Sequence, residues 1–180
     1  MKYIILDLEA TCWEEKNVQP NEIIEIGAVC IDDDLDVIDE ITLFVKPSVH
    51  PELSNFCKKL TTISQKMVDD APLFPKALKE FQDWIKSFND DYILCSWGFY
   101  DKTQFKNDCN LHNLDTRWLK NHISLKHQYA DIKGIKGVGM PTALKMEGLT
   151  MEGTHHRGID DAKNIAKIFI SCFNEWEFPI

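Results

Sequence analysis

The chain has 180 residues, of which 44% are apolar and 27% charged, and its formal net charge is −9. This length and composition exclude a disordered chain and predict one domain, residues 1–180, with a buried apolar core. No apolar run approaches the ~18 residues that cross a bilayer, so we expect no membrane partner.

The first part of the sequence predicts three strands. Short apolar, β-rich runs cover residues 2–8, 23–31 and 37–45, and an acidic turn near Asp33 joins the last two. Three consecutive strands favour an antiparallel unit at one edge of a sheet.

The second part predicts helices that alternate with strands. Apolar residues recur at helical spacing from Pro75 to Phe88, a buried strand covers residues 92–97, and a further helix follows Asp101. The clearest apolar stripe belongs to the last helix, residues 159–173. This order of elements predicts an α/β fold, a mixed sheet with helices on its faces.

Cysteines and charge restrict the compartment and the partner. The scattered cysteines include no Cys-x-x-Cys pair, and no long apolar leader follows Met1, which predicts reduced thiols in the cytoplasm. Between Arg117 and Met146 six bases oppose Asp131 alone: Arg117, Lys120, Lys126, Lys133, Lys136 and Lys145. This segment is either a site for a few phosphates or a solvated loop face.

Two carboxylates end the first strand. Asp7 and Glu9 are two residues apart, so both project from one face of that strand, at the end where open α/β sheets place their sites. Close carboxylates repel unless a cation lies between them, and hard oxygen ligands suit Mg²⁺ or Mn²⁺. The alternative is that the pair merely begins a polar loop.

Further polar residues follow the later elements. Asp101 comes just after the buried strand that ends in Ser-Trp-Gly, and His156 lies on a loop flanked by glycines. Asp160 and Asp161 begin the last helix. Asp160 is suited to cap that helix, which leaves Asp161 free for another task.

These three places together resemble the DEDDh 3′–5′ exonucleases. The shared motifs are Asp-Leu-Glu-Ala-Thr at residues 7–11, Asp101 after the strand end, and His156-x4-Asp161. Within that group the chain is most similar to the histone-mRNA exonuclease and Eri-1-like branch, which includes bacterial sporulation-pathway-inhibitor relatives. The resemblance runs from about residue 2 to residue 173. It implies a ribonuclease-H-like mixed sheet of about five strands, three antiparallel edge strands first, with helices on both faces.

The resemblance also implies an activity. Members of the group are metal-dependent 3′–5′ exonucleases, and this branch implies hydrolysis from the 3′ end of single-stranded or overhanging RNA with release of nucleoside 5′-monophosphates. One alternative is a DNA-end trimming or proofreading-type exonuclease, although no polymerase-binding segment is visible. The other is a regulatory binding protein on the same fold, which has no reason to bury clustered charge.

Residue roles follow from the resemblance alone. Two divalent cations, Mg²⁺ or Mn²⁺, would be bound by Asp7, Glu9, Asp101 and Asp161. Asp7 would bridge the two ions, Asp101 would act through water, and His156 would be the general base. His155 aligns with no catalytic position and is expected to be a loop residue, with a shift of one position left open.

The substrate contacts are also inferred from the resemblance. Ala10 and Thr11 would contact the terminal nucleotide, and Tyr100 would stack on its base unless it belongs to the core. Trp97 is expected in the core. Residues 135–144 are either a phosphate-binding Gly-x-Gly hairpin or a turn before a short helix that packs under the catalytic loop.

Overall fold

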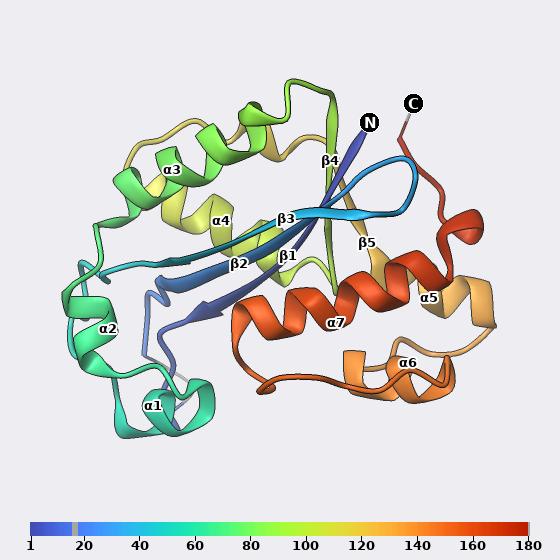
Figure 1. Cartoon of the computed structure of the whole chain (residues 1–180). Helices are drawn as coiled ribbons and strands as arrows, with labels where there is room; N and C mark the ends of the chain where they lie inside the picture. The colour runs from blue at the N-terminus through green and yellow to red at the C-terminus, as the bar shows by residue number, and fades with distance from the viewer. Residues whose placement is uncertain (16–17, 180) are drawn as a thin grey trace.

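A mixed sheet is the centre of the computed structural model, which describes residues 1–15 and 18–179 (Figure 1). Its strands are β1 (Lys2–Ala10), β2 (Ile23–Ile31), β3 (Val37–Phe44), β4 (Tyr92–Ser96) and β5 (His122–Ser124). The five strands lie in the order β3-β2-β1-β4-β5. The β3-β2 and β2-β1 pairs are antiparallel, and the β1-β4 and β4-β5 pairs are parallel. The expected antiparallel unit at one edge is confirmed.

Helices cover both faces of the sheet, as expected. They are α1 (Asn55–Thr61), α2 (Gln65–Asp69), α3 (Phe74–Ser87), α4 (Tyr100–Leu111), α5 (Leu125–Lys133), α6 (Met140–Met146) and α7 (Gly158–Ser171), with single-turn helices at Arg117–Leu119 and Phe173–Glu175. Among the residues described, no helix is both long and apolar enough to cross a membrane.

Alternation along β1 divides the core into two layers. Tyr3 and Ile5 pack with side chains of α5, α6 and α7, whereas Ile4 and Leu6 pack with those of α3 and α4. Strand β2 is buried along its whole length, while β3 is largely exposed, as an edge strand must be. The two layers fix the orientation of every side chain on β1, including the polar ones near its end.

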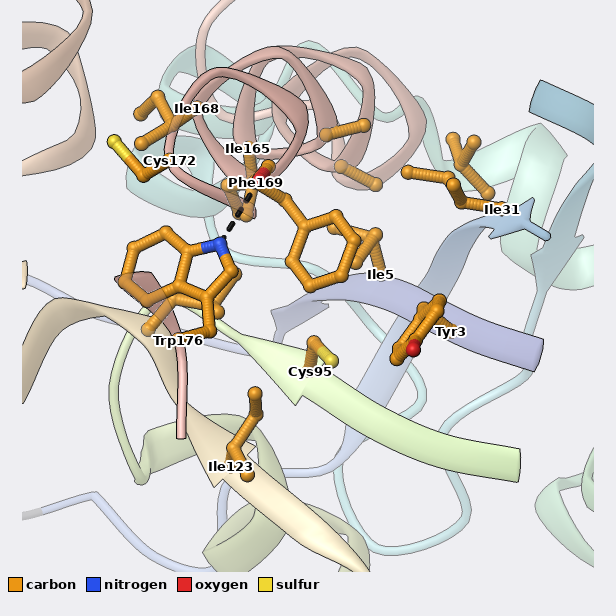
Figure 2. Close-up of a cluster of buried hydrophobic side chains, with 14 of the residues drawn as sticks. Tyr3, Ile5, Ile31, Cys95, Ile123, Ile165, Ile168, Phe169, Cys172 and Trp176 are labelled. Atoms are coloured by element: carbon orange, nitrogen blue, oxygen red, sulfur yellow. Dashed lines mark hydrogen bonds between the residues drawn. The ribbon is translucent and has the colours of Figure 1, made fainter. Parts of the chain in front are cut away.

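The core under α7 also holds the C-terminal segment (Figure 2). The Trp176 indole Nε1–H donates to the Phe169 carbonyl at 2.8 Å, so this ring is buried without an unpaired donor. The Tyr3 ring lies 5.1 Å from the rings of both Phe169 and Phe178. The C-terminal end of α7 is therefore anchored to the start of β1.

One boundary differs from the expectation in a way that matters for the site. Helix α4 begins at Tyr100, so Asp101 lies in its first turn instead of preceding the helix. Strand β4 ends at Ser96, and Gly98 has φ of +125°, a conformation that L side chains rarely adopt. This tight turn leaves room for the earlier start of the helix.

The start of α7 lies directly against the sheet. A Cβ added to Gly27 on β2 would lie 2.1 Å from the Gly158 carbonyl carbon and from the Ile159 nitrogen, and a Cβ on Gly158 would lie 3.0 Å from the Asp7 carbonyl oxygen. Only glycine at both positions permits this approach, because backbone atoms cannot yield as a flexible side chain does.

Replacing Gly27 with alanine should therefore destabilise the fold. The added methyl group has to push α7 from β2, and overpacking of this kind costs about 1–3 kcal/mol or more of unfolding free energy. The matched control is Gly137→Ala, whose Cβ would meet only the flexible Lys126 side chain, at 3.3 Å. Urea unfolding of both variants measures the difference, and equal midpoints would show that α7 does not need this contact.

Candidate active site

A cavity of about 340 Å³ opens where the C-terminal ends of β1 and β4 meet the start of α7. All five residues expected to do the chemistry line it: Asp7, Glu9, Asp101, His156 and Asp161. They come from β1, the first turn of α4, and the loop and first turn of α7. The structure thus brings together residues that are up to 154 positions apart in the sequence.

Strand β1 positions the first two carboxylates. The Leu8 side chain belongs to the core under α3 and α4, so Asp7 and Glu9 face the α7 side. Carboxylate oxygens of Asp7, Glu9 and Asp161 all lie within 4.8 Å of one another. Asp101 lies outside this tight group, and its Oδ1 accepts a hydrogen bond from the Leu8 backbone N–H at 3.1 Å.

Burial and mutual repulsion change the acidity of this cluster. Burial, followed by the charges of Asp161 and Glu25, raises the pKa of Glu9 to about 8. Burial also raises the pKa of Asp7 well above its ordinary value, with Asp101 and Glu9 adding to the effect. The pKa of Asp101 is raised by burial to about 6, although the Leu8 N–H opposes the shift. Without cations the cluster therefore retains protons near neutral pH.

The donor set fits divalent cations. Carboxylate oxygens are the ligands that Mg²⁺ and Mn²⁺ prefer, and a bound cation replaces repulsion between neighbouring charges with attraction. Three ligand oxygens within 4.8 Å of one another leave space for an ion to contact all of them. These carboxylates can therefore hold a metal ion at the C-terminal end of β1.

Both histidines of the loop line the cavity, and their rings stack at 3.9 Å. His155 Nδ1 lies 3.0 Å from both carboxylate oxygens of Asp161. The sequence alone predicts that His155 is a loop residue and does not predict this contact. The His156 backbone N–H donates to Asp161 Oδ2 at 2.9 Å, and His156 has φ of +66°. Burial, and then the neighbouring His155, lowers the pKa of His156.

The two acids at the start of α7 have different surroundings. The Asp160 carboxylate accepts from the Thr154 backbone N–H at 2.8 Å and so closes the loop on itself. Asp161 is 4% exposed and faces the cavity. The structure thus brings Asp161, and not Asp160, to Asp7 and Glu9.

Sequence reasoning missed a buried ion pair beneath the loop. Glu25 is fully buried on β2, directly opposite Glu9, and accepts from Arg157 Nε at 3.1 Å and Nη2 at 3.2 Å. It also accepts from the Gly158 N–H at 3.0 Å. A charged residue inside an otherwise apolar strand was the available signal, because such a residue is rarely buried without a partner.

Some of the residues expected to contact substrate line the cavity and others do not. Tyr100 is 56% exposed and lines the cavity, and Trp97 lines it as well while its Nε1–H donates to the Val138 carbonyl at 3.0 Å. Ala10 and Thr11 are buried and do not line the cavity. The Thr11 hydroxyl accepts from the Glu22 backbone N–H at 2.9 Å.

The Gly-x-Gly segment leads into a short helix, the second of its two expected forms. Gly139 is the N-cap of α6, and Met140 and Pro141 begin that helix. These three residues line the same cavity as the carboxylates of β1. The segment therefore forms one wall of the candidate site.

Comparison with known proteins agrees with this geometry. Residues 4–169 match the family model RNase_T, described as Exonuclease. The chain is 34% identical to 3′-5′ exoribonuclease 1 of Rattus norvegicus over 95% of its own length, and 31% identical to 3′-5′ exonuclease eri1 of Schizosaccharomyces pombe over 92%. It spans 52% of the first relative and 65% of the second, so it corresponds to about half to two thirds of these proteins.

The solved structures give the same assignment. The nuclease domain of 3′hExo, a DEDDh family member bound to rAMP, is 31% identical with a TM-score of 0.91, and the match covers 99% of this chain and 96% of that one. The ribonuclease-H-like fold expected from the motifs is confirmed. The chain therefore belongs to the exonuclease family, in the Eri-1-like branch of the DEDDh 3′–5′ exonucleases.

Proposed function

We propose that this chain is a metal-dependent 3′–5′ exonuclease that removes nucleoside 5′-monophosphates from the 3′ end of single-stranded or overhanging RNA. The observation that carries the proposal is the meeting of four carboxylates and two histidines in one cavity of a DEDDh-family chain. The relatives named exoribonucleases favour RNA over DNA. We place the activity in the cytoplasm, in keeping with six free cysteines.

The four acids would hold two divalent cations, Mg²⁺ or Mn²⁺: Asp7, Glu9, Asp101 and Asp161. Bound cations supply an activated water and neutralise the charge that develops on the phosphate and the leaving 3′ oxygen. The chain itself keeps the acids in place. The Leu8 N–H orients Asp101, and Glu25 fixes the start of α7 through Arg157 and Gly158.

His156 is proposed as the general base that takes the proton of the attacking water. Its ring lines the cavity, and Gly153, with φ of +74°, together with Gly158 flanks its loop. Because Glu25 holds Arg157 and Gly158, the loop repositions His156 on substrate binding from its Gly153 side. Tyr100 is proposed to stack on the terminal base, since its exposed ring borders the same cavity.

The proposal is tested directly with 5′-labelled single-stranded RNA and matched DNA, each incubated with the purified protein in Mg²⁺, Mn²⁺ or EDTA. We expect a ladder that shortens from the 3′ end of the RNA in the presence of metal and no shortening in EDTA. Cleavage that persists in EDTA, or intact RNA under all conditions, contradicts the proposal.

Asp7→Asn should abolish nearly all cleavage and at the same time raise the stability of the metal-free protein. Asp101 and Glu9 have a higher pKa in the folded chain than in the unfolded chain, where the pKa of each is about 4. Their stabilising contribution to the free energy of unfolding is therefore complete below about pH 4. This contribution is lost as the pH rises through about 6 for Asp101 and about 8 for Glu9. In EDTA the wild type should therefore lose stability between pH 5 and pH 8.

Thermal unfolding checks this expectation. At pH 8 in EDTA, Asp7→Asn should melt no lower than the wild type. Added Mn²⁺ should raise the Tm of the wild type but not that of Asp7→Asn, because ligands stabilise only a protein that binds them. Asp131→Asn, a change of an exposed carboxylate on α5, is the matched control and should respond to Mn²⁺ like the wild type. If Mn²⁺ raised the Tm of Asp7→Asn by as much as it raises that of the wild type, Asp7 would not be a metal ligand.

The two histidines should differ in their effect on turnover. His156→Ala should slow cleavage by about 10²–10⁴-fold, the usual contribution of a general base, with little change in metal affinity. His155→Ala should do far less, because a cation that binds Asp161 replaces the contact that His155 makes. Single-turnover rates at saturating metal measure both effects. The reverse ranking would assign the base to His155.

Preference for RNA should appear at the 3′-terminal nucleotide. A site that pairs the 2′-OH leaves its own polar group unsatisfied when that hydroxyl is missing, so it discriminates against deoxyribose. A DNA oligonucleotide that ends in one ribonucleotide should lose that residue quickly and then stall. Equal rates for all-DNA and ribo-ended substrates would instead support DNA-end trimming.

A further inference from the structure

A basic cleft lies beside α4, separate from the acidic cavity. Its cavity of about 180 Å³ lies between α4 and the segment that leads to β5, and we define the basic cleft by its lining residues Lys102, Lys106, Thr116, Arg117, Leu119 and Lys120. Four of these six side chains are cationic. Lys106, Arg117 and Lys120 are exposed, whereas Lys102 is half-buried.

The positive charge of this cleft is poorly neutralised. In the part of the chain that the structure describes, Lys102, Lys106 and Lys120 have no carboxylate within 4.0 Å, and only Arg117 is paired, with Asp115 at 2.9 Å. Elsewhere Lys133 is paired with Glu147 and Lys163 with Glu40. Gathering like charges in a chain of net charge −9 creates a local positive field, which favours an anionic ligand.

The cleft begins where the candidate active site ends. Tyr100 and Asp101 line the acidic cavity, and Lys102 is the next residue of α4. At 1.5 Å per residue, Lys106 lies about 8 Å farther along the helix axis than Asp101. Because successive residues of a helix face about 100° apart, a strand whose 3′ end occupies the cavity has to pass around the first turn of α4 to reach the cleft with the nucleotides that precede the scissile bond.

An exposed aromatic side chain lies at the start of α4, where Phe99 is the N-cap residue. Phe99 is 52% exposed, and its ring lies 4.7 Å from the His127 ring and 6.0 Å from the His122 ring. A large apolar ring that is half exposed to water is available to a stacking partner. Aromatic faces combined with a cationic groove are what proteins use to bind single-stranded nucleic acids without reading their sequence.

We propose that the basic cleft binds phosphates of the RNA strand upstream of its 3′ end, with Phe99, about one helical turn before Lys102, as an added stacking surface. The direction of the strand rests on the proposed function. The contacts are made to phosphates, so binding is independent of sequence, and a single DNA strand of the same length uses the same lysines.

The test compares two triple variants that lose the same charge. Lys102→Gln/Lys106→Gln/Lys120→Gln removes the unpaired cations of the cleft. Its matched control replaces three exposed lysines of α3: Lys76, Lys79 and Lys86. Fluorescence anisotropy of a 5′-labelled 12-nucleotide RNA, measured in EDTA at several salt concentrations, gives affinities without cleavage. Thermal melts establish that both variants are folded.

We expect the cleft variant to bind the RNA at least about tenfold more weakly than the control at low salt. Each phosphate contact on a single strand contributes about 0.7 to the slope of log K against log salt, so losing three contacts should reduce the slope by about 2. Phe99→Leu should weaken binding about fivefold or more through lost stacking. The matched DNA strand should lose the same factor as RNA in the cleft variant.

Equal affinities of the cleft variant and the control overturn the inference, and so does a wild type that fails to bind the RNA. A labelled 12-residue polyglutamate peptide identifies the other class of ligand. If the cleft variant loses affinity for this peptide but not for RNA, the cleft docks an acidic protein segment and the inference is wrong. If RNA binds through the cleft but is never shortened in Mn²⁺, the proposed function fails while the binding site stands.

Discussion

The contact between the start of α7 and strand β2 determines where the candidate chemistry can occur. Gly27 and Gly158 allow the two backbones to meet, and the buried Glu25 carboxylate binds both the Arg157 side chain and the Gly158 N–H. Burying a carboxylate is costly, and it is tolerated here because three donors satisfy its oxygens. The result is that Asp161, one turn into the same helix, reaches the carboxylates of β1.

That placement gathers negative charge where the fold alone would avoid it. Asp7, Glu9 and Asp161 converge within 4.8 Å, and Glu25 lies opposite Glu9 on the neighbouring strand. Among these four acids, and within the residues that the structure describes, Glu25 alone is paired with an arginine or lysine, Arg157. Asp161 contacts His155 instead, and burial with mutual repulsion raises the pKa of Asp7 and of Glu9, so bound cations would relieve the repulsion at this end of the sheet.

Most of this arrangement follows from patterns that the sequence displays. The strand over residues 23–31 and the helix after Gly158 have strong apolar periodicity, and their structural bounds match within a residue or two. Helices α1 and α2, with seven and five residues, were not predicted because periodicity needs a longer window. Strand β5, with three residues, exists only through its pairing with β4, which is a tertiary effect.

The site residues were also predictable where a regular strand or helix holds them, and not where tertiary contacts determine their position. Spacing on β1 predicted that Asp7 and Glu9 share one face, whereas the proposed ligand set as a whole came from the resemblance of three motifs to the DEDDh exonucleases. The position of His155 depends on a left-handed turn at His156, where local sequence gives no rule for the direction of the ring. Thr11 is a further case, since its hydroxyl is engaged by the Glu22 backbone, a partner eleven residues away.

The number of basic residues in a segment of the sequence is a poor guide to where an anion binds. Of the six bases between Arg117 and Met146, Lys133 is paired with Glu147, whereas Arg117 and Lys120 join Lys102 and Lys106 from α4. Asp101 and Lys102 are neighbours in sequence, yet the first lines the acidic cavity and the second the basic cleft, because successive residues of a helix face about 100° apart. A single helix thus separates a surface that attracts cations from one that attracts phosphates. A polyanion needs both, because the acids repel it until cations bind, and the lysines attract it at any time.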